Sequence, residues 1–207
     1  MPDRVLLLID HSVGVSDRGG YRNGDWMKTY VALFRGINVG GNNVLSMKNL
    51  VALLENIGSK NVKTYIQSGN AVFEHEEENS SLLSSRIRTT IKKSHGFEPQ
   101  VLLLELEDIE RAVRSNPFPE AESDPKTLHL YFLASMPNNP DLGVLESVKS
   151  DGERFALKDG VFYLHAPEGI GRSKLAANIE KVLSVAATGR NWRTVCKVMA
   201  MAKECGQ

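Results

Sequence analysis

The chain has 207 residues, and its 25 Lys and Arg balance its 25 Asp and Glu, so the formal net charge is zero. Hydrophobic residues make up 42% and charged residues 24% of the chain, which is ordinary for a globular protein and excludes a wholly disordered one. A uniformly basic nucleic-acid-binding domain is disfavoured, because such domains have a pI above about 9 and this chain has a pI of about 7.0. The residues do not identify a reaction.

The two cysteines, Cys196 and Cys205, are too few for a disulfide framework and match no zinc-ligand spacing. We therefore expect no metal site and no cofactor. The longest early apolar run, residues 5–9, is far shorter than the roughly 18 residues that a membrane span needs. The expected location is the reducing cytoplasm, with no membrane partner.

Residues 1–26 differ from the rest, because the stretch 12–26 is rich in Gly, Ser, Asp and Arg and has no sustained hydrophobic period. We expect a flexible N-terminal extension; a regulatory arm is the alternative.

From Met27 to residue 106, strand and helix patterns alternate. The first expected helix carries its apolar residues at the i, i+3, i+4 and i+7 spacing, and its cap and stop are Ser46 and Gly58. A second helix begins at Ser80 or Ser81 and ends at Gly96. The expected strands are 30–35, 61–67, 71–74 and 100–106. This β-α-β-β-α-β order is typical of the α/β plait, or ferredoxin-like fold.

After a short helix and a proline-rich linker, over 107–126, the pattern nearly repeats from 127 to 207. Strands are expected at 127–134, 154–158 and 161–165, and helices at 141–149 and 173–186. In place of a fourth strand we expect a helix with Trp192 as a core anchor. The predicted fold class is α+β, with two α/β-plait (ferredoxin-like) subdomains, 27–106 and 127–207, the second modified with a C-terminal helix.

A glycine-rich loop, RGINVGG, joins the first strand to the first helix, where backbone N–H groups and the helix dipole favour an anion. Its spacing fits neither a Rossmann fingerprint nor a P-loop. The alternative is that its glycines permit a tight turn with positive φ. The candidate ligand-binding residues in this loop are Arg35, Gly36, Asn38, Gly40 and Gly41.

The turn QSGN follows the second strand and supplies three more candidates, Gln67, Ser68 and Asn70. In a plait the first two strands run parallel with the third between them, so both loops leave the sheet at the same end. We therefore expect these side chains to converge with Arg35 and Asn38.

Two basic segments near the C-terminus, GIGRSK and TGRNW, are further candidates for anion binding. Cations at a helix start oppose the dipole, which an anion bound there would explain; a capped helix start with solvated charges is the alternative. The two segments are expected as loops at opposite ends of a helix of roughly 14 residues, about 20 Å apart. They could share one small phosphate only if that helix is shorter or bent. The candidates are Arg172, Ser173, Lys174, Arg190 and Asn191.

The histidines are weaker candidates. His165 ends a strand and could act as a general base, but no nucleophile partner is evident. His129 lies in an apolar strand and is expected to be a structural histidine with its hydrogen bonds satisfied.

Five motifs occur in a fixed order along the chain: RGINVGG at 35–41, YIQSGN at 65–70, NPF at 116–118, GIGRSKL at 169–175 and TGRNW at 188–192. With them the chain from Met27 to about Lys203 resembles the bacterial domain-of-unknown-function family 1697. The resemblance implies two α/β-plait-like subdomains and no particular activity.

Charge is unevenly distributed, since the last 39 residues hold seven basic and two acidic residues. The leading hypothesis is a binding protein whose partner is a phosphate-bearing small molecule or nucleic acid. One alternative is an enzyme acting on a small polar or phosphorylated substrate, with Arg35, Asn38, Gln67 and Asn70 as hydrogen-bond donors. The other is a protein-interaction scaffold. The sequence does not set the oligomeric state.

Overall fold

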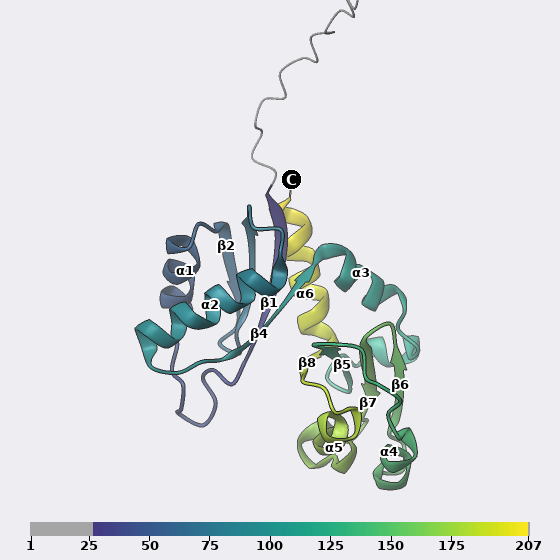
Figure 1. Cartoon of the computed structure of the whole chain (residues 1–207). Helices are drawn as coiled ribbons and strands as arrows, with labels where there is room; N and C mark the ends of the chain where they lie inside the picture. The colour runs from purple at the N-terminus through teal and green to yellow at the C-terminus, as the bar shows by residue number, and fades with distance from the viewer. Residues whose placement is uncertain (1–26, 207) are drawn as a thin grey trace, which may run out of the picture.

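The computed structural model describes residues 27–206; the predicted N-terminal extension, residues 1–26, lies outside them. The described chain forms two lobes (Figure 1), each built on a four-stranded antiparallel sheet. Helices cover these sheets, which confirms the α+β class and the two α/β plaits expected from the sequence.

The first plait follows the predicted order of elements, which are β1 (Lys28–Arg35), α1 (Met47–Asn56), β2 (Lys60–Tyr65), β3 (Asn70–His75), α2 (Ser80–His95) and β4 (Gln100–Glu105). Its strands are arranged β2-β3-β1-β4, and every neighbouring pair is antiparallel. Strands β1 and β2 are therefore parallel with β3 between them, so the segments that leave them lie at one end of the sheet, as predicted.

The helix caps of this plait agree with the sequence at three of four ends. Ser46 accepts a hydrogen bond from the Asn49 amide at the start of α1, and Gly58 follows the end of that helix with positive φ. Gly96 ends α2 in the left-handed conformation. The prediction that Ser80 or Ser81 caps α2 is wrong, because Asn79 precedes them and its Oδ1 accepts from the Leu82 amide at 3.0 Å.

The second half begins with α3 (Leu106–Arg114) and the 3-10 helix η1 (Pro119–Ser123). Its plait then comprises β5 (Leu128–Leu133), α4 (Leu142–Val148), β6 (Arg154–Lys158), β7 (Val161–His165), the 3-10 helix η2 (Ile170–Arg172), α5 (Lys174–Leu183) and β8 (Ala187–Asn191). The strand order is β6-β7-β5-β8, the same as in the first plait. Helix α6 (Trp192–Cys205) closes the described chain and is the predicted C-terminal helix.

The prediction that the second plait has no fourth strand is wrong, because β8 pairs with β5 from His129↔Asn191 to Leu133↔Ala187. The ATGRN sequence has weak strand propensity, so its conformation is set by pairing with β5 and not by local preference. Helix α5 ends at Leu183, where Ser184 adopts φ 55°, and is shorter than expected. Residues 188–191 consequently lie in a strand and not in a loop.

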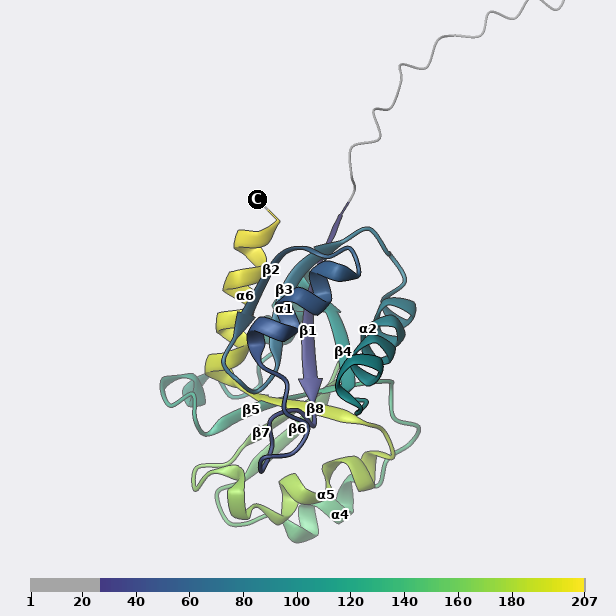
Figure 2. The ribbon, with the colours of Figure 1, turned by 90° about the vertical axis from the view of Figure 1, so that its left-hand side faces the viewer.

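Helix α6 and helix α3 pack between the two sheets, and they share a core with both. The core contains Val31 of β1, Leu130 of β5 and Val195 of α6, together with the predicted anchor Trp192. Figure 2 shows α1 and α2 on the opposite face of the first sheet, and α4 and α5 below the second sheet. Both faces of each sheet are therefore covered. Over residues 27–206, no helix has the length and apolar character of a membrane span.

Candidate functional site

The loop after β1 and the turn after β2 are tied together by Asn38. Its Nδ2 donates to the carbonyls of Leu45 and Gln67, both at 2.9 Å, and its Oδ1 accepts from the Leu45 amide at 2.8 Å. Asn38 has φ 54°, a left-handed conformation that asparagine tolerates better than most residues. All side-chain hydrogen bonds of Asn38 are thus used to shape the loop.

The glycines of the RGINVGG loop serve its backbone. Gly36, Gly40 and Gly41 have φ between 58° and 80°, and a Cβ built on any of them would meet nothing within 4 Å. These positions need glycine for its conformation and not for close approach of a neighbour. Their positive φ values agree with the alternative interpretation, a tight connection.

The QSGN turn is packed against the end of β1. At Gly69 (φ 79°) a Cβ would lie 2.6 Å from Ile37 Cδ1 and 2.7 Å from Phe34 Cβ, so here both conformation and space require glycine. Asn70 is completely buried and donates to the Tyr65 carbonyl at 3.0 Å and to Ser68 Oγ at 3.2 Å. The turn is therefore closely packed and internally hydrogen-bonded, and its Asn70 Oδ1 accepts from Arg190.

Arg190 reaches from β8 of the second plait to this turn. Its Nε donates to Asn70 Oδ1, and its Nη2 donates to the carbonyls of Phe34 at 2.7 Å and Gly69 at 3.1 Å. Burial lowers the pKa of Arg190 to about 10, and no carboxylate of the described chain offsets this effect. At neutral pH the junction between the plaits thus holds a partly buried positive charge whose hydrogen-bond acceptors are all neutral carbonyl or amide oxygens.

Arg35 reaches in the opposite direction, from β1 of the first plait to α5 of the second. Its guanidinium forms a two-point ion pair with Glu180, with Nη2 to Oε2 at 2.6 Å, and its Nη1 donates to the Ala187 carbonyl at 3.2 Å. The hydrogen bond from Arg35 is the main reason that the pKa of Glu180 is lowered. Glu180 also accepts from the Ala187 amide at 2.8 Å. The ion pair therefore bonds both the amide and the carbonyl of the first residue of β8.

A cavity of about 400 Å³ lies beside these two arginines, between the end of β1, strands β5 and β8, and helix α5. Its lining includes charged residues, polar residues and an apolar wall: Arg35, Glu180, Arg190, His129, Tyr131, Thr188, Ile170 and Ile179. Of the candidates from the sequence, Arg35 and Arg190 line it directly. Asn38, Gln67, Ser68 and Asn70 lie next to it through their contacts with each other and with Arg190.

Four residues of the GIGRSK segment, Gly169, Gly171, Arg172 and Ser173, line a different cavity, of about 370 Å³, whereas Ile170 lines the first one. The second cavity also contains the acidic residues Asp151, Glu153 and Glu168. Arg172 and Ser173 line it, and the Ser173 hydroxyl caps α5 by accepting from the Ala176 amide at 2.9 Å. Asn191 likewise caps α6, accepting from the Thr194 amide at 2.9 Å. Helix capping gives Ser173 and Asn191 a structural role. The negative charges of Asp151, Glu153 and Glu168 disfavour the binding of an anion beside Arg172.

The two histidines behave differently. His165 accepts a hydrogen bond at Nδ1 from Arg154 at 3.0 Å, and burial and that arginine lower its pKa. His129 is 8% exposed, and its Nδ1 has no hydrogen-bond partner in the described part of the chain. The expectation that His129 is fully satisfied is therefore wrong, because no donor or acceptor of the described chain lies in hydrogen-bonding geometry with its Nδ1.

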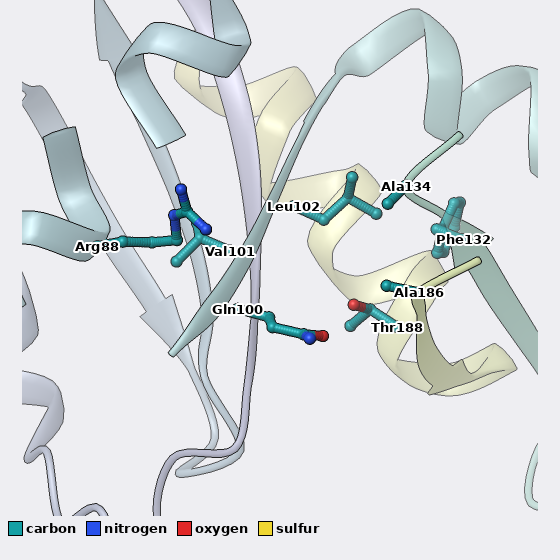
Figure 3. A pocket seen from close by; sticks show the side chains of 8 residues that line it. All are labelled: Arg88, Gln100, Val101, Leu102, Phe132, Ala134, Ala186 and Thr188. Atoms are coloured by element: carbon teal, nitrogen blue, oxygen red, sulfur yellow. The ribbon is translucent and has the colours of Figure 1, made fainter. Parts of the chain in front are cut away.

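A smaller cavity, of about 210 Å³, lies on the other side of the junction, between β4 and the second sheet. Figure 3 shows Gln100 extending from β4 toward Thr188 of β8, with Leu102 near Ala134. Apart from Arg88 at one end, its remaining lining is apolar. It carries fewer polar groups than the cavity beside Arg35 and Arg190.

Neither Glu180 nor Tyr131 was among the residues singled out from the sequence. An acidic residue near the end of a helix and a tyrosine in an apolar strand have no distinguishing pattern, so only the fold identifies them. Gly189 is the one residue in the sequence whose type is related to the position of Tyr131. A Cβ there would lie 2.7 Å from the Tyr131 ring, so the glycine of TGRN lets that ring lie across β8. Within residues 27–206, no three His, Cys, Asp or Glu side chains are grouped as metal ligands.

Comparison with known proteins agrees with this architecture. Among solved structures the chain is similar to the conserved bacterial protein SP0830 from Streptococcus pneumoniae, with 28% identity and a TM-score of 0.61 over 85% of this chain and 99% of that one. No curated protein matches the chain. Residues 27–163 match the model of a family described as a protein of unknown function, DUF1697. The chain therefore belongs to the DUF1697 family.

Proposed function

We propose that this protein binds a small molecule bearing a phosphate group in the cavity between its two plaits. The observation that carries the proposal is a charge imbalance: two arginines, Arg35 and Arg190, line the cavity, but only one carboxylate, Glu180, does so. Arg190 is partly buried and bonds only to neutral acceptors, so a bound anion would compensate its charge.

Arg190 retains hydrogen-bonding capacity for such an anion. Its Nη1 donates once, to the Gly189 carbonyl at 2.8 Å, so a second Nη1 N–H has no acceptor among residues 27–206. Hydrogen bonds between a guanidinium and a phosphate are charge-assisted and stronger than neutral ones.

Arg35 can exchange partners at low cost. The side chains of Arg35 and Glu180 are 42% and 37% exposed, and ion pairs at such sites contribute only about 0–1 kcal/mol to stability. A phosphate offers the same two-point geometry as the Glu180 carboxylate and carries more charge. In this proposal Glu180 occupies the position on Arg35 that the ligand's anionic group takes on binding.

The geometry favours a small ligand over a nucleic acid. Both faces of each sheet are covered by helices, so neither sheet offers the open platform on which many plait proteins stack bases. The cavity of about 400 Å³ falls at the lower end of the range for small-molecule sites.

The proposal is tested by calorimetric titration with inorganic phosphate and with simple phosphate monoesters at low salt. Arg35→Gln should weaken phosphate binding by roughly tenfold, the equivalent of about 1.4 kcal/mol. Glu180→Gln should strengthen it, because Arg35 loses its internal competitor. Arg172→Gln, in the second cavity, is the matched control and should leave the affinity unchanged.

Absence of phosphate binding overturns the proposal, and so does weakening by Arg172→Gln in place of Arg35→Gln. An oligonucleotide that binds where phosphate monoesters do not, with an affinity that falls steeply with salt, would show a nucleic-acid partner instead.

A further inference from the structure

The smaller cavity, between β4 and the second sheet, contains a hydroxyl group that the phosphate site leaves unexplained. Thr188 of β8 lies directly opposite Phe132 of β5, so both side chains are on the sheet face that packs into the shared core. Thr188 is 5% exposed, and Figure 3 shows it at the cavity with Gln100 extending toward it. Its hydroxyl forms no hydrogen bond with any group of residues 27–206. A buried hydroxyl without a partner is unfavourable, so its presence needs an explanation.

The Thr188 hydroxyl can be reached from the cavity. In the described chain, three unpartnered side-chain atoms are completely enclosed by protein: Ser59 Oγ, Arg88 Nε and His129 Nδ1. Thr188 Oγ1 is not one of them, although it has no partner either. A molecule in the cavity can therefore form a hydrogen bond with Thr188, which it cannot do with an enclosed atom.

Gln100 supplies a second donor at the same cavity. Its Oε1 accepts a hydrogen bond from Arg35 Nη1 at 3.3 Å. Because a guanidinium only donates, this contact assigns the oxygen of the carboxamide to the side that faces Arg35. The other carboxamide atom, Nε2, has no acceptor among residues 27–206. Thr188 and Gln100 thus offer O–H and N–H groups that an acceptor on a ligand can use.

The rest of this cavity is suited to one apolar ring. Leu102, Phe132 and Ala134 are among its apolar lining residues, and its volume is about 210 Å³. An apolar cavity of about 150 Å³ is large enough to bind benzene, so a six-membered ring fits the available space.

The smaller cavity adjoins the proposed phosphate site. Thr188 lines both cavities, and Arg35 of the phosphate site donates to Gln100 of the smaller cavity. Building on the proposed function, we infer that the ligand is a phosphate monoester whose organic part is a single ring with a hydrogen-bond acceptor, and that this ring occupies the cavity between β4 and β8. Arg35 and Arg190 bind the phosphate group. Thr188 and Gln100 bind the acceptor and determine specificity.

The inference is tested by calorimetry with three probes: methyl phosphate, phenyl phosphate and pyridin-3-yl phosphate. They share the phosphate group, and the last two differ only in that a ring nitrogen, an acceptor, replaces one C–H group. The wild-type protein should bind phenyl phosphate about tenfold more tightly than methyl phosphate, because the ring buries apolar surface. It should bind pyridin-3-yl phosphate about fivefold more tightly still, because the nitrogen accepts from Thr188 or Gln100.

Two substitutions separate the ring from its acceptor. Thr188→Val keeps the shape of the side chain and removes the hydroxyl, and it should reduce the fivefold preference for pyridin-3-yl over phenyl phosphate to less than about twofold. Ala134→Leu fills part of the cavity and should lower the affinity for phenyl phosphate to that for methyl phosphate. Ala52→Leu, which lines a separate cavity beside α1, is the matched control and should change none of the three affinities.

The folding of each variant is checked by thermal unfolding without ligand. Thr188→Val should keep the midpoint, because valine suits a strand and an unsatisfied hydroxyl is removed. Equal affinity for methyl and phenyl phosphate, or an unchanged preference for pyridin-3-yl phosphate in Thr188→Val, overturns this inference and leaves the phosphate site standing. If none of the three probes and no inorganic phosphate binds, both proposals are overturned.

Discussion

Arg190 donates from Nε to Oδ1 of the completely buried Asn70, 120 residues earlier in the chain. Each residue belongs to a motif, TGRNW and QSGN, that the sequence marks as a candidate for ligand contact. In the structure the two motifs bind each other and join the plaits. Part of what the motifs encode is therefore the junction, and the proposed ligand site lies beside it.

Replacing Arg190 should destabilise the protein strongly. Arg190→Met removes the donor to Asn70 Oδ1 and the donor to the Phe34 carbonyl, whereas the Gly69 carbonyl keeps its hydrogen bond from the Phe34 amide. Each such loss costs about 1–3 kcal/mol, and we expect a total of more than about 3 kcal/mol in urea unfolding. Arg193→Met is the matched control, because Arg193 is exposed in the first turn of α6. It should change stability by less than about 0.5 kcal/mol. Equal effects of the two substitutions would refute a structural role for Arg190.

The ion pair of Arg35 and Glu180 should contribute little to stability, in contrast to Arg190. A double-mutant cycle with Arg35→Gln and Glu180→Gln should give a coupling free energy below about 1 kcal/mol, because both side chains are more than a third exposed. The coupling should fall further when the salt concentration is raised from about 0.01 M to about 1 M. A coupling above about 2 kcal/mol that is insensitive to salt would show that Glu180 cannot be displaced by a ligand.

Gly189→Ala tests the packing that places the Tyr131 ring at the cavity. The new Cβ would lie 2.7 Å from Tyr131 Cε1, so the ring must move, and we expect a loss of about 1–3 kcal/mol in unfolding free energy. In a Tyr131→Ala background the same substitution should cost much less. Gly171→Ala is the control, since its Cβ would meet nothing within 4 Å. A cost of Gly189→Ala that persists without the Tyr131 ring would contradict this account.

Stability should fall as the pH drops from about 7.5 to about 5.5. Burial lowers the folded-state pKa of His129 and His165 below the unfolded value of about 6.5. The unfolded chain therefore takes up protons first as pH falls through 6.5, and the stability present above that pH is lost. The pKa of Glu180 is lowered from 4.5, so its contribution is lost only in more acidic solution.

Urea unfolding at about pH 7.5, 6.5 and 5.5 measures this dependence. The double variant His129→Leu, His165→Gln should show a flatter profile over the same interval. A wild-type unfolding free energy that stays constant from pH 7.5 to 5.5 would show that neither histidine has a lowered pKa.

Local sequence was sufficient for most of the fold. Apolar periodicity and capping residues such as Ser46 and Gly96 act within one or two turns of chain, so they located the helices and all strands but one. The plait order then placed the RGINVGG loop and the QSGN turn at one end of the sheet, because strand direction follows from connectivity. Arg35 and Asn70 could be grouped on this basis alone.

Contacts between residues distant in the chain decided the rest. Strand β8 has weak local propensity and exists through pairing with β5, so its boundaries could not be obtained from its own residues. The partners of Arg35 and Arg190 lie 145 and 120 residues away, and no local pattern marks Glu180 as one of them. The unsatisfied Nδ1 of His129 depends on what surrounds the ring on every side, which is a property of the packed structure.

The sequence by itself determined the two plaits and the end of the sheet where the RGINVGG and QSGN motifs lie. Only tertiary packing decided which of those residues join the plaits and which line the cavity, because burial and pairing arise between elements and not within them.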